Sequence, residues 1–364
     1  MLAYCFFLGI AKSAKAMRGF RDRDYLETID GYFFCVLDSI HPEDRVIAYL
    51  KYVPDPRGKW GRGRKRLRRA LPNYTMHDLL GTFRFLKANN PEYLFFSHVM
   101  NIEISAVPLD KILTHFKPEE KLSYFTRRED LDTLQKKTVE LASLISEESG
   151  VPLRFFGVTG SILIDAHQNF SDIDLIIYGK KNSASVKETL KQIYESHAFP
   201  IRRFNAKEFR EWCLSKARLY PLTYNEAAKI LKRRWNRGVY EETFFSIHPV
   251  KTEDEIDENY GDRIFKPKGM VKIEAIVSDS SESDFLPAIY KVKDVRVLEG
   301  EKVSDINEVV SYEGLYGGLA KEGERILAYG KMERVTDRRS GKIYHRVLIG
   351  SREAEGRDYI KPLT

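Results

Sequence analysis

The spacing of apolar and polar residues divides the chain into three regions, and the first is predicted to mix strands with helices. Two runs rich in aromatic and β-branched residues, 32–39 and 45–53, predict strands. Apolar residues at helical spacing predict a helix over 76–88, and a second helix is expected to begin near Leu109. Residues 17–125 are therefore interpreted as an α+β region.

The second region, residues 126–255, alternates between helical and strand patterns. Apolar residues recur at helical spacing from 128 to 148, and Gly150 is placed to end this helix. The other predicted helices are 183–197, 206–217 and 224–236, and the predicted strands are 153–160, 172–179 and 243–250. This alternation sets the region apart from its neighbours as a separate domain.

The third region, residues 256–364, carries strand patterns without a helical period. Strands are predicted at 269–279, 286–298, 325–335 and 342–350, with a hairpin turn at 336–341. Short strands joined by polar turns are typical of a small β-barrel or sandwich. The C-terminal region is therefore predicted to be all β.

The N-terminal residues 2–10 are apolar, but they do not fit a membrane segment. A spanning helix needs about 20 apolar residues, so this run is too short. A signal peptide carries its positive charges before the apolar run, whereas Lys12 and Lys15 follow it here. We expect no membrane partner, and we expect that Met17 begins the native protein and that residues 1–16 are an extension.

The composition excludes disorder and favours an anionic partner. Hydrophobic residues make up 43% of the chain, which is enough for packed cores. The 60 Lys and Arg residues against 53 Asp and Glu residues give a net charge of +7, which leaves nucleic acid and nucleotides open as partners. The 3 cysteines show no CxxC spacing, so they predict neither a zinc site nor a disulfide framework and favour the cytoplasm.

The candidate chemistry is concentrated in residues 157–179. Side chains of a strand alternate between its faces, so Asp172 and Asp174 are expected on the same face. Two neighbouring carboxylates repel each other unless a cation lies between them, and Mg²⁺ prefers carboxylate oxygens. Gly160 and Ser161 fall at a predicted strand-to-helix turn, where backbone N–H groups bind phosphate oxygens. The sequence thus predicts a phosphate site beside a metal-binding carboxylate pair.

This pattern resembles the signature of the DNA polymerase beta-like nucleotidyltransferase superfamily over roughly residues 128–250. The shared features are Gly160-Ser161, a spacing of ten residues, Asp172-Ile173-Asp174-Leu175, and the apolar strands on both sides. The resemblance implies a mixed sheet with helices and two Mg²⁺ ions held by Asp172, Asp174 and a third carboxylate. It also implies that Gly160 and Ser161 bind the β- and γ-phosphates of a nucleoside triphosphate. Nucleoside monophosphate would then pass to an acceptor hydroxyl.

The third carboxylate is not evident in the sequence. The resemblance places it on a neighbouring strand, but the predicted strand 243–250 carries Ser246 and His248 where an acid is required. Glu242 at the edge of that strand and Glu274 on a later strand are the two candidate metal ligands. A third interpretation is that no such acid exists.

Two basic segments are candidates for binding anions. The arm over residues 54–72 contains Arg62, Arg64, Lys65, Arg66, Arg68 and Arg69, which are expected to follow a nucleic-acid backbone. The alternative is a solvated loop that pairs with the acidic run 252–258. A second cluster, on the last predicted helix of the second region, is a candidate contact of the triphosphate or the substrate, or else a solvated helix face. It contains Lys229, Lys232, Arg233, Arg234 and Arg237, of which Arg233 and Arg234 are the candidate nucleotide-binding residues.

Together these features predict an α+β protein with a central nucleotidyltransferase-like mixed sheet, an N-terminal α+β region and a C-terminal small β-barrel or sandwich. The first hypothesis is a Mg²⁺-dependent enzyme that transfers nucleotides from an NTP, with RNA as the preferred acceptor. The second hypothesis is an inactive fold that retains RNA or nucleotide binding. The third is a transferase that acts on a protein or a small molecule.

Overall fold

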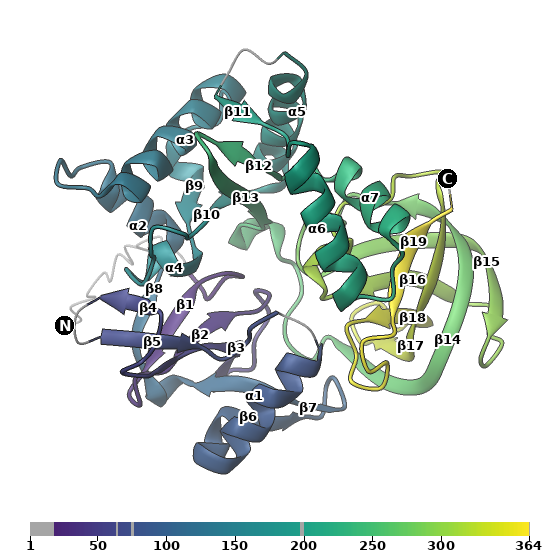
Figure 1. Cartoon of the computed structure of the whole chain (residues 1–364). Coiled ribbons are helices and arrows are strands. Elements are labelled where there is room, and N and C mark those ends of the chain that lie inside the picture. Colours follow the sequence, from purple (N-terminus) through teal and green to yellow (C-terminus); the bar gives the residue numbers. More distant parts are fainter. Residues whose placement is uncertain (1–17, 63–64, 74–75, 197–199, 364) are drawn as a thin grey trace, which may run out of the picture.

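The computed structural model describes residues 18–62, 65–73, 76–196 and 200–363, and these form three regions that meet around a common centre (Figure 1). The predicted extension over residues 1–16 lies outside the described residues. The combination of helices with several sheets confirms the predicted α+β class. None of the described helices is long and apolar enough to cross a membrane.

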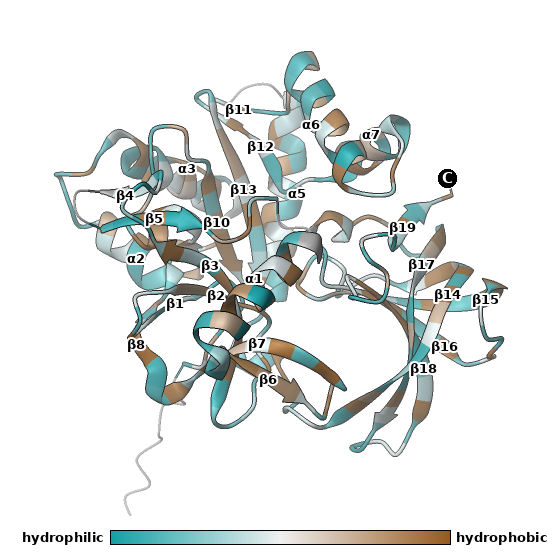
Figure 2. Ribbon diagram, turned by 60° about the horizontal axis from the view of Figure 1, so that its bottom comes forward, coloured by the Kyte–Doolittle hydropathy of each residue, from teal (hydrophilic) through white to brown (hydrophobic). Residues whose placement is uncertain are grey.

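The N-terminal region is built on antiparallel strands. Their order is β4-β5-β3-β2-β1-β8, and β7 pairs with both β3 and β6. The elements are β1 (Tyr25–Thr28), β2 (Phe33–Val36), β3 (Arg45–Pro54), β4 (Trp60–Arg62), β5 (Lys65–Arg69), α1 (Met76–Asn89), η1 (Pro91–Tyr93), β6 (Leu94–Ser97), β7 (Ile102–Pro108), η2 (Leu109–Lys111) and β8 (Ile112–Phe116). The β4–β5 hairpin is mostly hydrophilic, whereas β6 and β7 are mostly hydrophobic (Figure 2).

Both faces of the N-terminal sheet are covered. On one face, Leu86 of α1 packs with Phe34 and Leu50 of the sheet. On the other face, Tyr25, Phe33, Cys35, Tyr52 and Leu67 form a cluster with Leu163, Ile164 and Ala166 of the central region. The burial of apolar surface on this second face therefore fixes the N-terminal sheet against the segment that follows Gly160-Ser161.

The central region has a five-stranded mixed sheet in the order β11-β12-β13-β10-β9, in which only β10 and β13 run parallel. Helices α3 and α5 pack on this sheet through one apolar core. The elements are α2 (Pro118–Phe125), α3 (Thr133–Ser149), η3 (Leu153–Phe155), β9 (Phe156–Val158), α4 (Gly160–Leu163), β10 (Ile173–Tyr178), α5 (Lys180–Ser196), β11 (Ile201–Arg202), α6 (Ala206–Leu219), α7 (Tyr224–Arg233), β12 (Arg237–Tyr240) and β13 (Thr243–Val250).

In the C-terminal region the strand pairings form a ring. Strands β14, β15, β16, β18 and β17 pair in that order, and β17 pairs back with β14, as expected of the predicted barrel. Only β16 and β18 run parallel, an order that resembles the OB-fold, a Greek-key barrel. The elements are η4 (Glu253–Glu255), β14 (Arg263–Asp279), β15 (Ala288–Glu299), β16 (Ile306–Ser311), η5 (Gly314–Tyr316), β17 (Arg325–Asp337), β18 (Ile343–Ile349) and the edge strand β19 (Tyr359–Pro362).

The structure corrects two predicted helices. The helix expected near Leu109 is a single 3₁₀ turn followed by strand β8, because the residues after Lys111 pair with β1 at the sheet edge. The helix predicted over 224–236 ends at Arg233, and Arg237 begins β12. The segment is extended because it pairs with β13, where Gly238 lies opposite Phe245. Glycine is required there, since an added Cβ would lie 2.7 Å from the hydroxyl of Tyr194.

The C-terminal ring contains a buried group of charges. Lys331 on β17 lies 2.9 Å from Glu333, and Glu333 pairs with Arg346 of β18 at 2.8 Å. The side chains of Lys331 and Glu333 are each only 2% exposed. A separate contact joins this region to the N-terminal region, since Arg352 donates to the carbonyl of Glu103 at 2.8 Å.

We expect that Glu333→Gln lowers the free energy of unfolding by about 3–5 kcal/mol, because it leaves the buried Arg346 without its carboxylate and Lys331 with Glu353 as its remaining partner. The matched control is Glu299→Gln, which breaks the more exposed Lys272–Glu299 pair and is expected to cost at most about 1 kcal/mol. Chemical denaturation of both variants measures the difference. Equal losses would contradict the stabilising role of the buried group.

Candidate functional site

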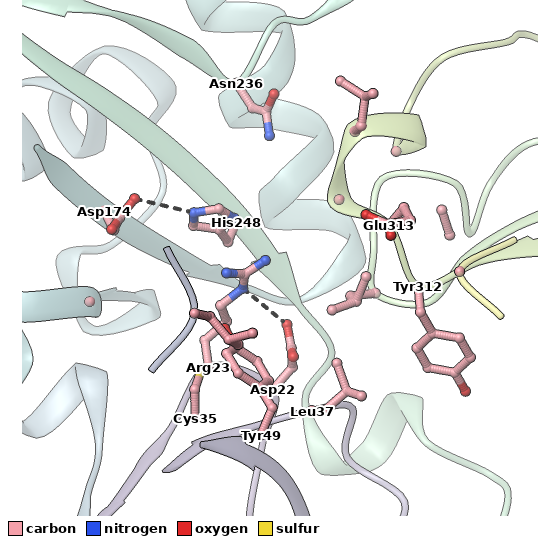
Figure 3. A pocket seen from close by; sticks show the side chains of 18 of the residues that line it. Asp22, Arg23, Cys35, Leu37, Tyr49, Asp174, Asn236, His248, Tyr312 and Glu313 are labelled. Atoms are coloured by element: carbon pink, nitrogen blue, oxygen red, sulfur yellow. Dashed lines mark ion pairs between the residues drawn. The ribbon is translucent and has the colours of Figure 1, made fainter. Parts of the chain in front are cut away.

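The three regions enclose a cavity of about 390 Å³ beside α4 and β10. In the close-up, Arg23 and Tyr49 of the N-terminal region face Asp174 and His248 of the central sheet, and Glu313 comes from the C-terminal region across the cavity (Figure 3). The charged and hydroxyl-bearing residues that line it include Asp22, Arg23, Lys51, Arg69, Ser161, Asp172, Asp174, Lys216, Tyr220, Arg234, Arg237, His248, Asp284 and Glu313. The predicted carboxylates and the predicted Gly-Ser turn therefore line the same cavity.

Gly160 lies directly against Asp174. Its φ of +70° is in the left-handed region, and an added Cβ would lie 2.6 Å from Oδ2 of Asp174. The N–H of Thr159 donates to the carbonyl of Asp174 at 2.9 Å, which holds the two segments together. Glycine is thus required on two grounds, since a side chain would strain the backbone and would displace the carboxylate.

Asp172 and Asp174 have different surroundings although they are two residues apart. Part of the Asp172 side chain is open to solvent, and the rest packs among the residues around the cavity. Repulsion from Asp174, followed by this partial burial, raises the pKa of Asp172 to about 6. Burial alone would raise the pKa of Asp174, but hydrogen bonds from His248 and Ser246 and the charge of Lys51 outweigh it and lower that pKa. The two carboxylates therefore repel each other strongly, and a divalent cation bound between them would relieve that repulsion.

The strand β13 holds the carboxylate of Asp174 in place. Asp174 of β10 pairs in register with Ser246, whose Oγ donates to Oδ1 of Asp174 at 2.5 Å. Nε2 of His248 lies 2.8 Å from the same Oγ and 3.5 Å from Oδ1. Burial, followed by repulsion from Arg23, lowers the pKa of His248 to about 4. A neutral hydrogen-bonding pair therefore occupies the place where the resemblance implies a third acid.

The structure does not bring the two candidate third carboxylates to the pair. Glu242 lies before β13, pairs with Arg202 at 2.9 Å and is 83% exposed. It stands four residues before Ser246, and the strand rise separates those positions by about 13 Å. Glu274 belongs to the C-terminal ring and pairs with Arg325 at 2.9 Å. Among the described residues no group of three or more His, Cys, Asp or Glu side chains is arranged to hold a metal.

The carboxylate pair nevertheless fits Mg²⁺. Carboxylate oxygens are the ligands this ion prefers, and Mg²⁺ is often held by one or two carboxylates with its other positions filled by water and phosphate. Asp172 and Asp174 both line the cavity, and His248 and Ser246 lower the pKa of Asp174, which keeps its carboxylate ionised for a cation. These two residues would hold the ion, and the described residues offer no acid for a third protein ligand.

Two cations at the site, Arg23 and Lys51, were missed by the sequence prediction. Arg23 precedes β1 and pairs with Asp22 at 3.4 Å, and Lys51 of β3 is only 8% exposed. A lysine inside the apolar run of β3 was a signal that the sequence offered, whereas nothing in it pointed to Arg23. Arg237, a member of the predicted second basic cluster, lines the cavity from β12, where it pairs in register with Ser246 and so lies in line with Asp174 across the sheet.

The basic arm forms the β4–β5 hairpin at the edge of the N-terminal sheet. Of its predicted nucleic-acid contacts, Arg69 lines the cavity, with its guanidinium 4.5 Å from the ring centre of Trp60. Lys65 pairs with Glu27, Arg68 pairs with Asp55, and Arg66 donates to the carbonyl of Gly61. Arg64 and the side chain of Arg62 lie outside the described residues.

The acidic run 252–258 does not pair with the described part of this hairpin. Its Glu253 pairs with Arg21, and Glu258 pairs with Arg263 at 2.6 Å. The alternative interpretation of the basic arm, a loop neutralised by this run, therefore finds no ion pair among the described residues.

The two arginines at the end of α7 point to different places. Arg233 donates to Glu324 at 2.6 Å and to the carbonyl of Leu319, and it does not line the cavity. Arg234 is only 9% exposed, lines the cavity, and donates to the carbonyls of residues 314 and 315 at 2.8 and 2.9 Å. The structure therefore brings Arg234, and not Arg233, to the predicted site.

The fold and the cavity define an α+β protein with a carboxylate pair set against a Gly-Ser turn. No family model matches the chain, and no solved structure matches it significantly. A protein of Methanocaldococcus jannaschii with the name uncharacterized protein MJ1086 is 32% identical over 350 residues, which cover 94% of this chain and 98% of that protein. The chain belongs to the same family as this archaeal protein.

Gly160→Ala is expected to weaken the binding of Mn²⁺, used as a probe for Mg²⁺, by at least about tenfold, because the methyl group displaces the carboxylate of Asp174. The matched control is Gly150→Ala at φ +66°, where an added Cβ meets no atom within 4 Å. Both variants should lose about 1–2 kcal/mol of stability through backbone strain. Calorimetric titration with Mn²⁺ checks the prediction, and unchanged affinity in Gly160→Ala would refute it.

Asp22 is expected to make the protein less stable as the pH rises from 4 to 7. Burial raises the pKa of Asp22 to about 6, so the folded state keeps a proton that the unfolded state releases near pH 4. The stability of Asp22→Asn relative to wild type should therefore increase by roughly 2–3 kcal/mol over this interval. Denaturation at several pH values measures this, with Asp257→Asn, at a 90% exposed position, as the control that should show no trend.

Proposed function

We propose that this protein is a Mg²⁺-dependent nucleotidyltransferase that moves a nucleoside monophosphate from an NTP to an acceptor hydroxyl. The observation that carries the proposal is the contact of Gly160 with the carboxylate of Asp174, with Asp172 beside it in one cavity. This contact supports a site in which a phosphate-binding turn and a metal-binding pair act on one ligand. The resemblance to the polymerase beta-like superfamily rests on the same residues.

The residues around the carboxylate pair would bind the triphosphate and orient the carboxylate of Asp174. A bound Mg²⁺ supplies positive charge for the phosphates and lowers the pKa of a coordinated hydroxyl. The backbone at Gly160 and the hydroxyl of Ser161 would bind phosphate oxygens. Ser246 and His248 hold the carboxylate of Asp174 through the hydrogen bonds described above. Of the two Mg²⁺ ions that the resemblance implies, the carboxylate pair accounts for one.

The N-terminal sheet would complete the triphosphate site. Arg23, Lys51 and Arg69 line the cavity from this sheet, and the pKa shifts of the aspartates reflect the charges of Lys51 and Arg69. Charges held in a partly buried site interact more strongly than in water. These three cations would therefore neutralise the triphosphate without relying on Arg233, which is engaged elsewhere.

The acceptor and the cellular location are two further predictions. RNA was expected from the basic arm, and the OB-like order of the C-terminal strands supports the same idea, since OB-folds bind oligonucleotides. The described arm residues other than Arg69 contact protein neighbours, which reduces the support that the arm gives. A reaction that consumes NTP is placed in the cytoplasm, in line with the absence of a disulfide pattern.

The observation that favours a second candidate function is the pair Ser246 and His248 at the place of the third acid. A nucleotidyltransferase fold without that acid would bind RNA or nucleotide without transferring it. The two candidates differ in product formation and agree on ligand binding. Product formation is therefore the quantity to measure.

Wild-type protein incubated with α-labelled NTPs, Mg²⁺, RNA and a small-molecule cell extract is expected to transfer label to an acceptor. Asp174→Asn should reduce the rate by at least about 100-fold, because a charged group that acts in the transition state is lost. The matched control is Asp165→Asn. Asp165 lies in the connection that leads from α4 to β10, and its carboxylate pairs with Lys121. No labelling by wild type would favour the binding function, whereas labelling that survives in Asp174→Asn would contradict the role of this carboxylate in transfer.

A further inference from the structure

The wall of the cavity opposite the N-terminal sheet carries three cations of its own. They are Lys216 on α6, Arg234 after α7 and Arg237 on β12, and all three line the cavity. Arg237 pairs in register with Ser246, and Ser246 with Asp174, so two strand spacings of about 5 Å each separate Arg237 from Asp174. The backbone of Arg237 is therefore about 10 Å from that of Asp174, and its side chain is close enough for the charges of Asp174 and Asp172 to act on it.

None of these three cations forms an ion pair with a described carboxylate. Burial lowers the pKa of Arg237, and the attraction of Asp174 and Asp172 offsets only part of this effect. The guanidinium of Arg237 makes no hydrogen bond or ion pair with any described residue. Lys216 contacts the rings of Trp212 and Tyr220, at 5.7 and 5.8 Å from their centres. Arg234 gives one nitrogen to backbone carbonyls, while its buried Nε has no acceptor in the described part of the chain. Cations removed from water in this way are costly unless an anion joins them.

The acids on the same wall do not balance these charges. Asp284 is engaged, since it pairs with Lys187 at 2.6 Å and accepts the indole N–H of Trp235 at 2.9 Å. Glu313 accepts a hydrogen bond from the hydroxyl of Tyr220, and burial raises its pKa to about 7. Burial also lowers the pKa of Lys216 to about 8, which shows how far this wall is removed from water. The wall therefore has a surplus of positive charge near neutral pH.

The size and lining of the cavity indicate what kind of anion fits. Tyr312 and Glu313 lie across the cavity from Asp174, in the connection that leads from β16 to η5 (Figure 3). Trp212 and Leu315 add apolar surface beside the cations. The whole cavity has a volume of about 390 Å³, at the low end of the roughly 300–1,000 Å³ of small-molecule pockets, and the NTP would share this space with the acceptor. A compact ligand with one anionic group matches this wall better than a polymer that needs a continuous groove.

We propose that the acceptor is a small hydroxyl compound that carries a phosphate or carboxylate group, held by Lys216, Arg234 and Arg237. This inference rests on the proposed nucleotidyl transfer and identifies the chemical class of its acceptor. The hydroxyl oxygen of the acceptor forms a bond to the α-phosphorus of the NTP, and the bond from that phosphorus to the β-phosphate oxygen breaks. Pyrophosphate leaves, and the hydroxyl proton passes to solvent. No oxidant or reductant is needed.

The test is a calorimetric titration of inorganic phosphate into the full protein, with Mg²⁺ and a saturating non-hydrolysable ATP analogue present. Lys216→Gln and Arg237→Gln are each expected to raise the Kd of phosphate by about tenfold, as loss of a charge-assisted hydrogen bond does. Lys216→Gln should change the Kd of the analogue by less than about threefold. Arg69→Gln is the matched control, and it should weaken the analogue while leaving phosphate binding unchanged.

Three outcomes would overturn the inference or its basis, and each is distinct. Phosphate binding that neither substitution weakens, with normal binding of the analogue, overturns the acceptor assignment alone. Single-stranded RNA that displaces phosphate and loses binding in both variants assigns the wall to a polymer instead. A wild-type protein that does not bind the analogue in the presence of Mg²⁺ overturns the nucleotidyl transfer itself. The two substitutions lie on different elements, so a folding defect in one leaves the other to decide.

Discussion

The site depends on the contact between the backbone of Gly160 and the carboxylate of Asp174. No side chain fits between them, so α4 and β10 are held at one fixed separation. The apolar cluster around Leu163 and Ile164 then fixes the N-terminal sheet against the same segment. From the other side, Ser246 of β13 fixes the direction of the carboxylate. The geometry of the cavity follows from this one close approach and from the packing built on it.

Charged residues from all three regions together determine the electrostatic potential in the cavity. The acids come from the central sheet, whereas Lys51 and Arg69 come from the N-terminal sheet. The C-terminal region contributes Glu313 and the carbonyls that hold Arg234. Removing any one region would leave either the acids or the cations without their counterparts. Strong coupling of opposite charges across separate regions is costly to lose where water is excluded, so the three regions are expected to be retained together.

The sequence predicted the local part of this site and missed the part that depends on packing. Gly160 and Asp174 are found by their spacing, because a turn and a strand face are local features. Arg23 was not predicted, since its role arises only when separate elements meet. Glu242 was expected near the carboxylate pair because it shares a strand face, but pairing with Arg202 fixes it at the far end of β13. In the fold, the helix expected near Leu109 failed because an edge strand was free to pair there.

The end of α7 has a mechanical consequence for the cavity. Arg233 is bonded to Leu319 and Glu324, and Arg234 is bonded to the carbonyls of Gly314 and Leu315. All of these partners lie in the connection between β16 and β17, so that connection and α7 are clamped to each other. Widening the cavity on this side requires the two to swing together or the clamp to break. Motions of such covering segments often limit turnover, and here the hinge would have to lie outside the clamped pair.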